Sequence, residues 1–151
     1  MKEFKNITEI LDFAIGEEQS AVDFYLLMAA QSKNSESKTI FREFAEEEMR
    51  HKANLTKIKE DGTLKLSDEK VKDLKITEYL IDVKPSPAMG YQEALILAMK
   101  KEKAAFRMYT VLASQATDPA VKALLESLAL EESRHKLRFE IEYDDVVFKE
   151  N

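Results

Sequence analysis

The sequence predicts an all-α protein, a four-helix bundle with one long crossover between the second and third helices. Glycine and proline occur only three times each, which favours long helices over frequent turns. Four long stretches repeat apolar residues with helical spacing, and a long connection over residues 61–87 separates the second stretch from the third. A chain of 151 residues can bury one core, so residues 1–151 are expected to form a single domain.

The first two predicted helices are delimited by capping residues and by a glycine. The first is expected over about residues 7–32, where Asn6 and Glu9 are three residues apart and can form a capping box. The second is expected over about residues 36–60, and Gly62 supplies the glycine that often ends a helix. The segment between these helices is short, so they are expected to form an antiparallel hairpin.

The last two predicted helices form a second hairpin. The third is expected over about residues 88–116. The fourth begins at Asp118 and Pro119, an N-cap residue followed by a proline in the first turn, and it continues to about Tyr143. The remaining residues, 144–151, are compatible with a helix or with an irregular tail.

The connection over residues 61–87 determines the topology of the bundle. An extended chain covers roughly 3.3 Å per residue, so this segment can run the whole length of a bundle. It contains two prolines, and the residues after Ser67 fit a short helix. These features favour a bundle with one crossover over a simple up-down-up-down order.

The two hairpins repeat each other at an offset of 84 residues. The matching positions include polar residues as well as apolar ones, which is more than a shared amphipathic composition explains. The matching pairs are Glu18 and Glu102, Ala21 and Ala105, Tyr25 and Tyr109, Gln31 and Gln115, Glu47 and Glu131, Glu48 and Glu132, and His51 and His135. A helical hairpin therefore occurs twice in this chain.

Each predicted helix carries an apolar stripe that is interrupted at its middle by a glutamate. The stripes of the second and fourth helices also carry a histidine one turn after the glutamate. In each hairpin both glutamates lie about 15 residues, or roughly 22 Å, from the turn, so they are level. If the crossover sends the third helix back along the second, a two-fold axis relates the hairpins. All four glutamates and both histidines then converge.

Such a group of residues indicates a dinuclear metal centre. Four carboxylates in a core repel one another, and burying each charge costs several kcal/mol, whereas two divalent cations would offset all four charges. The Glu-x-x-His spacing places both side chains on one helix face. Two glutamates can bridge the metals, and two can bind one metal each beside a histidine. Oxygen and nitrogen donors without sulfur suit iron or manganese, and zinc also fits.

The pattern resembles the di-iron signature of ferritin-like proteins, in which two helices supply a glutamate and two supply Glu-x-x-His. The chain is similar to the ferritin-like domain of the rubrerythrin and bacterioferritin families over about residues 7–143, through "GEEQSAVDFY", "KKEKAAFRMY", "EEEMRH" and "EESRH". This resemblance implies a ferritin-like four-helix bundle that binds two iron ions. The metal ligands that it implies are Glu18, Glu48, His51, Glu102, Glu132 and His135.

The chain departs from the patterns of these families in three ways and matches one of their features only weakly. Ala105 stands where rubrerythrins carry an additional glutamate, and the chain has none of the cysteines of the iron domain that rubrerythrins commonly append. An external electron donor is therefore expected. Met49 occupies the place of a haem-binding methionine of bacterioferritins, but the adjacent Arg50 and the single motif predict a surface residue and no haem. The few residues after Tyr143 leave little room for the fifth helix of cage-forming ferritins.

Five residues near the predicted ligands have roles that the sequence leaves open or minor. Tyr25 and Tyr109 lie two turns after a stripe glutamate, and they either hydrogen-bond to a metal-binding carboxylate or fill the core. Glu47 and Glu131 either accept a hydrogen bond from a histidine or are surface charges. Glu17 aligns with a lysine in the repeat and is expected to be solvated.

The sequence thus predicts a dinuclear iron protein, with manganese as a further option, that reacts with dioxygen or hydrogen peroxide as an oxidoreductase. Ala21 and Ala105 are small residues beside the site, and they either leave a pocket for such an oxidant or permit close helix packing. There are two alternatives. One is an iron-binding protein that sequesters or delivers the metal without turnover, and the other is a structural bundle that holds zinc inertly.

The composition narrows the partners and the compartment. The net charge is −6 and no basic block is present, which argues against nucleic acid as a partner. The apolar stretches are too short to cross a membrane and the N-terminus does not resemble a signal peptide, so a cytoplasmic location is expected. A homodimer is the expected assembly, because two-fold dimers are the commonest oligomers.

Overall fold

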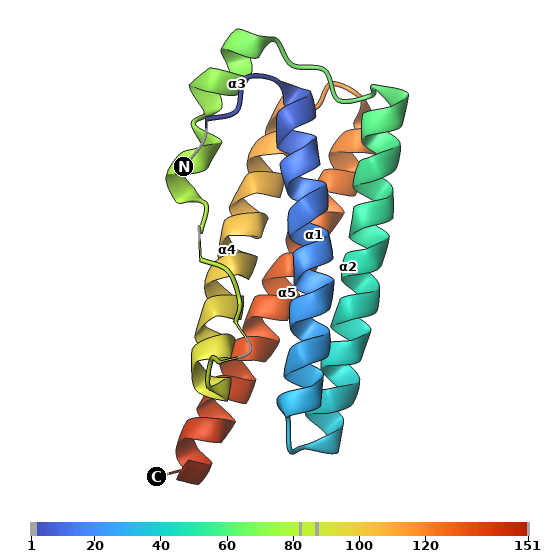
Figure 1. The fold of residues 1–151 in the computed structure, drawn as a ribbon. Coiled ribbons are helices and arrows are strands. Elements are labelled where there is room, and N and C mark those ends of the chain that lie inside the picture. The colour runs from blue at the N-terminus through green and yellow to red at the C-terminus, as the bar shows by residue number, and fades with distance from the viewer. Residues whose placement is uncertain (1–2, 82, 87, 151) are drawn as a thin grey trace.

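Four long helices dominate the computed structural model, which describes residues 3–81, 83–86 and 88–150. They are α1 (Ile7–Gln31), α2 (Ser35–Asp61), α4 (Tyr91–Gln115) and α5 (Pro119–Glu150). The connection between α2 and α4 contains a short helix, α3 (Asp68–Leu74), and a 3-10 turn, η1 (Ile76–Tyr79). No strand occurs in these ranges. The predicted all-α bundle with one long crossover is confirmed (Figure 1).

The helix ends follow the predicted capping signals with one difference. The Asn6 side chain accepts a hydrogen bond from the backbone N–H of Glu9 at 2.9 Å, but the Glu9 carboxylate accepts from the N–H of Lys5 and not from that of Asn6. Gly62 ends α2 with a φ of 62°, a conformation that glycine adopts without steric cost. The Asp118 side chain accepts backbone hydrogen bonds at the start of α5.

Two boundaries differ from the predicted ones. Helix α4 begins at Tyr91 and not near residue 88, because a turn closed by a 3.0 Å hydrogen bond from Met89 N–H to the Ser86 carbonyl precedes it. Helix α5 continues through the ambiguous tail to Glu150, and Val146 in that tail packs against the core. Residues 144–150 therefore extend α5.

The core consists of two apolar clusters with a polar layer between them. The first cluster includes Ile10, Leu55, Leu112 and Leu125, and the second includes Met28, Phe41, Leu95 and Phe139. In every long helix, the residues between the two clusters include the predicted glutamate. The crossover runs outside the bundle along α4, so that α2 and α4 run in the same direction (Figure 1). The direction of α4 brings the two hairpins into the two-fold arrangement that the repeat predicts.

Charged residues are distributed along all four long helices. Within the described ranges, no helix has a stretch both long enough and apolar enough to cross a membrane. Many apolar residues of these helices form the two core clusters.

Candidate metal centre

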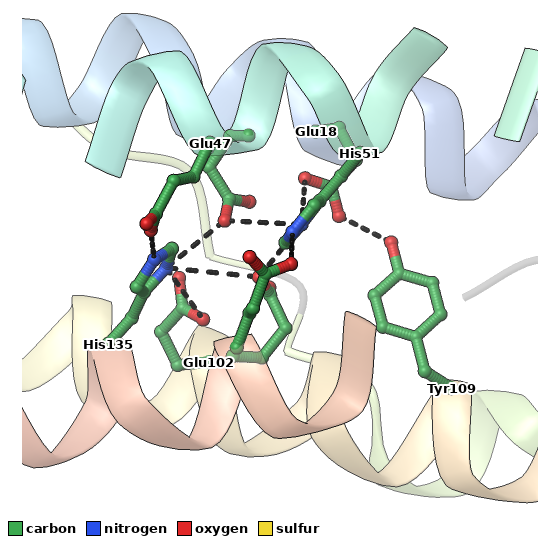
Figure 2. A network of polar contacts seen from close by, with 9 residues as sticks. Glu18, Glu47, His51, Glu102, Tyr109 and His135 are labelled. Atoms are coloured by element: carbon green, nitrogen blue, oxygen red, sulfur yellow. Dashed lines mark hydrogen bonds and ion pairs between the residues drawn. The ribbon is translucent and has the colours of Figure 1, made fainter. Parts of the chain in front are cut away.

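The structure brings all six predicted residues together in the polar layer of the bundle (Figure 2). Helices α1 and α4 each contribute one glutamate, and α2 and α5 each contribute a glutamate and a histidine. All six side chains are buried, with 1–2% of each residue exposed to solvent. The residues are Glu18, Glu48, His51, Glu102, Glu132 and His135.

Each of these six side chains has one atom that is buried without a hydrogen-bond partner. The atoms are Glu18 Oε2, Glu48 Oε1, His51 Nδ1, Glu102 Oε2, Glu132 Oε1 and His135 Nδ1. Elsewhere in the described part of the chain, only Arg138 Nε shares this property. A buried polar atom without a partner is costly and rare, so six of them at one place fit a site whose shared partner is a cation.

The six residues form two overlapping groups, each of which could hold one metal ion. The first group consists of Glu18, Glu48, His51 and Glu132, and the second of Glu48, Glu102, Glu132 and His135. Within each group, the candidate ligand atoms all lie within 4.8 Å of one another. Glu48 and Glu132 belong to both groups. The geometry therefore distinguishes two shared carboxylates from two that face one position only, a distinction that the sequence left open.

Both imidazoles are oriented by glutamates of the opposite hairpin. Nε2 of His51 lies 2.6 Å from a carboxylate oxygen of Glu131, and Nε2 of His135 is hydrogen-bonded to Glu47 (Figure 2). A carboxylate accepts and does not donate, so each Nε2 carries a proton, and it is Nδ1 that faces the cluster and offers a lone pair once the ring is neutral. Of the two interpretations of Glu47 and Glu131, the structure supports hydrogen bonding to a histidine, across the bundle.

The two predicted tyrosines occupy different surroundings. The Tyr109 hydroxyl donates a hydrogen bond to Oε1 of Glu18, and burial raises the pKa of Tyr109, so that it remains a donor. The ring of Tyr25 instead packs against Phe139, with centroids 5.1 Å apart, and edge-on against His135 at 6.3 Å. Tyr109 therefore bonds to a carboxylate of the cluster, whereas Tyr25 fills the core beside a histidine.

Phe44 is a neighbour of the cluster that the sequence interpretation missed. Its ring stacks on the imidazole of His135 at a centroid distance of 4.0 Å and an interplanar angle of 25°. Phe44 lies on the inward stripe of α2, so its partial burial was predictable. Its contact with His135 was not, because stripe spacing identifies the face of a helix but not the residue across the bundle that it meets.

When no metal is bound, the carboxylates of the cluster raise the pKa values of both histidines, so the imidazoles are protonated. Burial lowers the pKa of His51, but Glu132 and Glu18 outweigh it and raise this pKa to about 11. Nδ1 of His51 lies 3.1 Å from Glu132 and 3.5 Å from Glu18. Burial also lowers the pKa of His135, but the carboxylates of Glu102 and Glu47 outweigh it and contribute to raising this pKa to about 10.

The shifts of the carboxylates have opposite signs. Burial and the charge of Glu132 raise the pKa values of Glu48 and Glu102 well above the usual range. Burial also acts to raise the pKa of Glu132, but the nearby imidazole of His51 contributes to lowering it to about 2. Without metal, the cluster therefore keeps extra protons near neutral pH and holds positive charge at the place where cations would bind.

A cavity between α1 and α4 reaches the carboxylates of the cluster. Ala21 and Ala105 both line it, as do Leu80, Ile81 and Pro85 of the crossover. The sequence predicted the alanines but not the crossover residues, because nothing in their local pattern points to the site. Residues of several helices complete the lining, among them Phe24, Met108, Tyr109 and Glu102.

Lys101 connects the elements around this cavity. Its ammonium group lies 3.5 Å from the carboxylate of Glu17 on α1 and 3.5 Å from the carbonyl oxygen of Ile81 in the crossover. Glu17 was expected to be solvated, and its side chain is 36% exposed, but it also forms this ion pair. The pair joins the two hairpins at the edge of the cavity.

The comparison with protein families agrees with this geometry. The Rubrerythrin family matches residues 9–143, which include all six residues of the cluster and most of the bundle. No curated protein and no solved structure matches the chain. The match identifies the bundle as a ferritin-like fold of the di-iron carboxylate type, and the buried cluster provides a candidate dinuclear metal site. The chain therefore belongs to the Rubrerythrin family.

Proposed function

We propose that the cluster binds two iron ions and that the loaded site reacts with dioxygen or hydrogen peroxide. In this proposal, Glu48 and Glu132 belong to both candidate groups and would help to hold both ions. Glu18 and His51 would help to hold one ion, and Glu102 and His135 the other. The observation that carries the proposal is the set of six inward atoms without hydrogen-bond partners, one from each of these residues.

The donor set supports iron in particular. Four carboxylates and two imidazoles offer oxygen and nitrogen atoms and no sulfur, which suits iron or manganese. Two divalent ions offset the four carboxylate charges. They also replace the protons that the metal-free cluster retains, because a metal ligand must be deprotonated at the atom that binds.

The residues around the cluster support reaction with a small oxidant. An iron pair, when bound, supplies the electrons that reduce dioxygen or peroxide. Glu131 and Glu47 hold Nδ1 of the two histidines toward the cluster, and Tyr109 orients Glu18 through its hydroxyl. The cavity beside Ala21 and Ala105 leaves space for a small molecule next to the carboxylates.

Electrons must come from outside this chain if the reaction is to repeat. The sequence contains no cysteine, so it holds no thiolate-bound iron that could pass electrons to the cluster. We therefore propose an external electron donor. Ferrous protein should react once with dioxygen or peroxide and then remain ferric until a reductant is added.

The test is to load the protein with ferrous iron without oxygen and then to add dioxygen or peroxide. We expect about two ions per chain and their oxidation in one rapid phase, followed by stopped-flow absorbance and by a ferrous-specific chelator. A Glu18→Gln, Glu102→Gln double variant serves as the control and should bind less iron.

Two results would replace the proposal with one of its alternatives. Ferrous iron that binds but is not oxidised faster than iron in buffer would indicate sequestration or delivery. Purification with zinc that ferrous iron cannot displace would indicate a structural site. Elemental analysis of protein purified without added metal distinguishes these results.

A further inference from the structure

Helix α5 is apolar on two opposite sides. One side faces the core and contains Leu125, Leu128 and Phe139. The other side carries four apolar residues at spacings of seven, four and seven: Leu130, Leu137, Ile141 and Phe148. With 3.6 residues per turn, these four lie within about 20° of one line along the helix, and we refer to them as the outer stripe.

The outer stripe is exposed along its whole length. Its residues are 60%, 57%, 43% and 81% exposed in chain order. The most exposed, Phe148, lies in the last turns of α5, which extend past the start of α4 (Figure 1). A surface helix needs one apolar face to join its bundle, so a second, opposite face indicates a second contact.

The repeat supplies an internal comparison for this surface. In α2, the positions equivalent to Leu130, Leu137 and Ile141 are occupied by Glu46, Ala53 and Lys57. Both helices occupy the same place in their hairpins. The outer stripe is therefore not required for packing within the bundle, and it is a feature of α5 alone.

The outer stripe is symmetric about position 139. Leu130 and Phe148 are each nine residues from that position, and Leu137 and Ile141 are each two residues from it. Two antiparallel copies of such a helix place the stripe against itself, as a two-fold interface requires. We propose that α5 of a second copy of this chain packs antiparallel on the outer stripe. Leu130 then meets the partner's Phe148, and Leu137 meets the partner's Ile141.

One pair of charges beside the stripe supports a second copy in this orientation. Arg134 and Asp145 are both exposed and lie on the same flank of the outer stripe, about 40° and 60° from its line. They are nearly equidistant from position 139. The antiparallel arrangement therefore places Arg134 opposite the partner's Asp145, and the two-fold axis repeats this pair of opposite charges.

The first experiment measures the mass of the protein in solution by sedimentation velocity. We expect wild type to sediment as a dimer of the 17.4 kDa chain and a Leu137→Glu, Ile141→Glu double variant as a monomer. The matched control is Ala53→Glu, Lys57→Glu at the equivalent positions of α2, which should remain dimeric. Circular dichroism confirms that each variant is folded. A monomeric wild type, or a dimer that survives the α5 substitutions, would overturn the proposal.

The second experiment tests the orientation through disulfide formation, which is clean because the chain has no cysteine. Helices 8–10 Å apart bring facing Cα atoms to about 5 Å, within reach of a disulfide. Leu130→Cys and Phe148→Cys proteins should cross-link when mixed and oxidised. Neither should cross-link alone, because in an antiparallel pair each cysteine lies about 27 Å from its own copy. Cross-linking of either variant alone, without cross-linking between the two, would overturn the antiparallel arrangement.

Discussion

The α1/α2 hairpin and the α4/α5 hairpin contribute the same set of side chains to the cluster but surround it differently. Each provides two glutamates and one histidine, and each histidine is hydrogen-bonded by a glutamate of the other hairpin. Yet Tyr109 bonds to Glu18, whereas its counterpart Tyr25 packs against aromatic rings. The repeat has therefore kept the residues that face the cluster, while the residues that support them differ between the hairpins.

Positions near the two-fold axis explain part of this difference. Glu17 and Lys101 are equivalent in the repeat, and their charged groups lie 3.5 Å apart across the bundle. Two identical charges at that place would repel, so a glutamate and a lysine are compatible where two glutamates would not be. His51 and His135 also face each other, with ring centroids 6.4 Å apart. These two equivalent positions have kept the same residue because each candidate metal group contains one histidine. A pair of positions that meets across the axis can diverge only if the two residues remain complementary.

The largest expected effect separates shared ligands from unshared ones. Because Glu48 and Glu132 belong to both groups, Glu48→Ala or Glu132→Ala should abolish binding at both metal positions. His51→Ala and His135→Ala should each leave about one ion per chain, since each removes a donor from one group only. Elemental analysis after equilibrium dialysis measures the stoichiometry. If Glu47→Ala abolished binding while Glu48→Ala did not, the assignment of Glu48 as a ligand would be wrong.

The second prediction concerns the stability of the metal-free protein. Glu48, Glu102, His51 and His135 all have folded-state pKa values above their usual ones, so the folded chain keeps protons that the unfolded chain releases. Stability should therefore fall as the pH rises, from near 4.5 for the glutamates and from near 6.5 for the histidines, up to about 10 for His135 and about 11 for His51. Each such proton changes the free energy of unfolding by about 1.4 kcal/mol per pH unit.

Urea unfolding of metal-free protein between pH 6 and pH 9 measures this trend. Glu132 has the opposite shift, with a pKa of about 2, but its contribution changes only below pH 4.5. A Glu48→Gln variant should show a flatter profile, and a variant of the exposed Glu46, Glu46→Gln, should follow wild type. Ferrous or manganous ion should raise the melting temperature more at pH 7.5 than at pH 5.5, where protons compete for the ligands. Stability that rises between pH 6 and pH 9 would contradict the proposed proton balance.

The sequence predicted the framework of the fold and the six residues of the cluster because local rules determine both. Asn6, Gly62 and Asp118 are caps that act within one turn, and the Glu-x-x-His spacing acts on one helix face. The repeat at an offset of 84 residues showed which positions of the two hairpins are equivalent and therefore lie at the same level of the bundle. The roles of Tyr109 and Phe44 could not be predicted in the same way, because each depends on rotamers and helix crossing angles across the bundle.

The third prediction compares the supports of the two histidines. Glu131→Gln and Glu47→Gln should each weaken one metal position by about 10- to 100-fold, because each loosens the hydrogen bond that orients an imidazole. The stacked ring of Phe44 gives His135 a second support. Glu47→Gln should therefore have the smaller effect of the two. Manganese titration by calorimetry measures both affinities, and equal losses would show that Phe44 does not hold His135 in place.

The smallest effect should distinguish the two tyrosines. Tyr109→Phe removes the hydrogen bond to Glu18 and leaves a buried carboxylate oxygen without its donor. The expected change is about 1 kcal/mol, or roughly fivefold in the affinity of the position that Glu18 faces. Tyr25→Phe keeps the ring that contacts Phe139 and His135, so both metal affinities should remain near those of wild type.

Paired measurements on these two variants separate a specific role from general loosening of the core. Both substitutions remove one hydroxyl from a buried tyrosine at equivalent positions of the repeat, so each is the control for the other. The loss in Tyr109→Phe should be confined to the Glu18 position, because the Glu102 position takes its unshared donors from Glu102 and His135. Equal effects of the two substitutions would mean that both tyrosines support the cluster to the same extent. The two hairpins would then not differ in how they hold the candidate ligands.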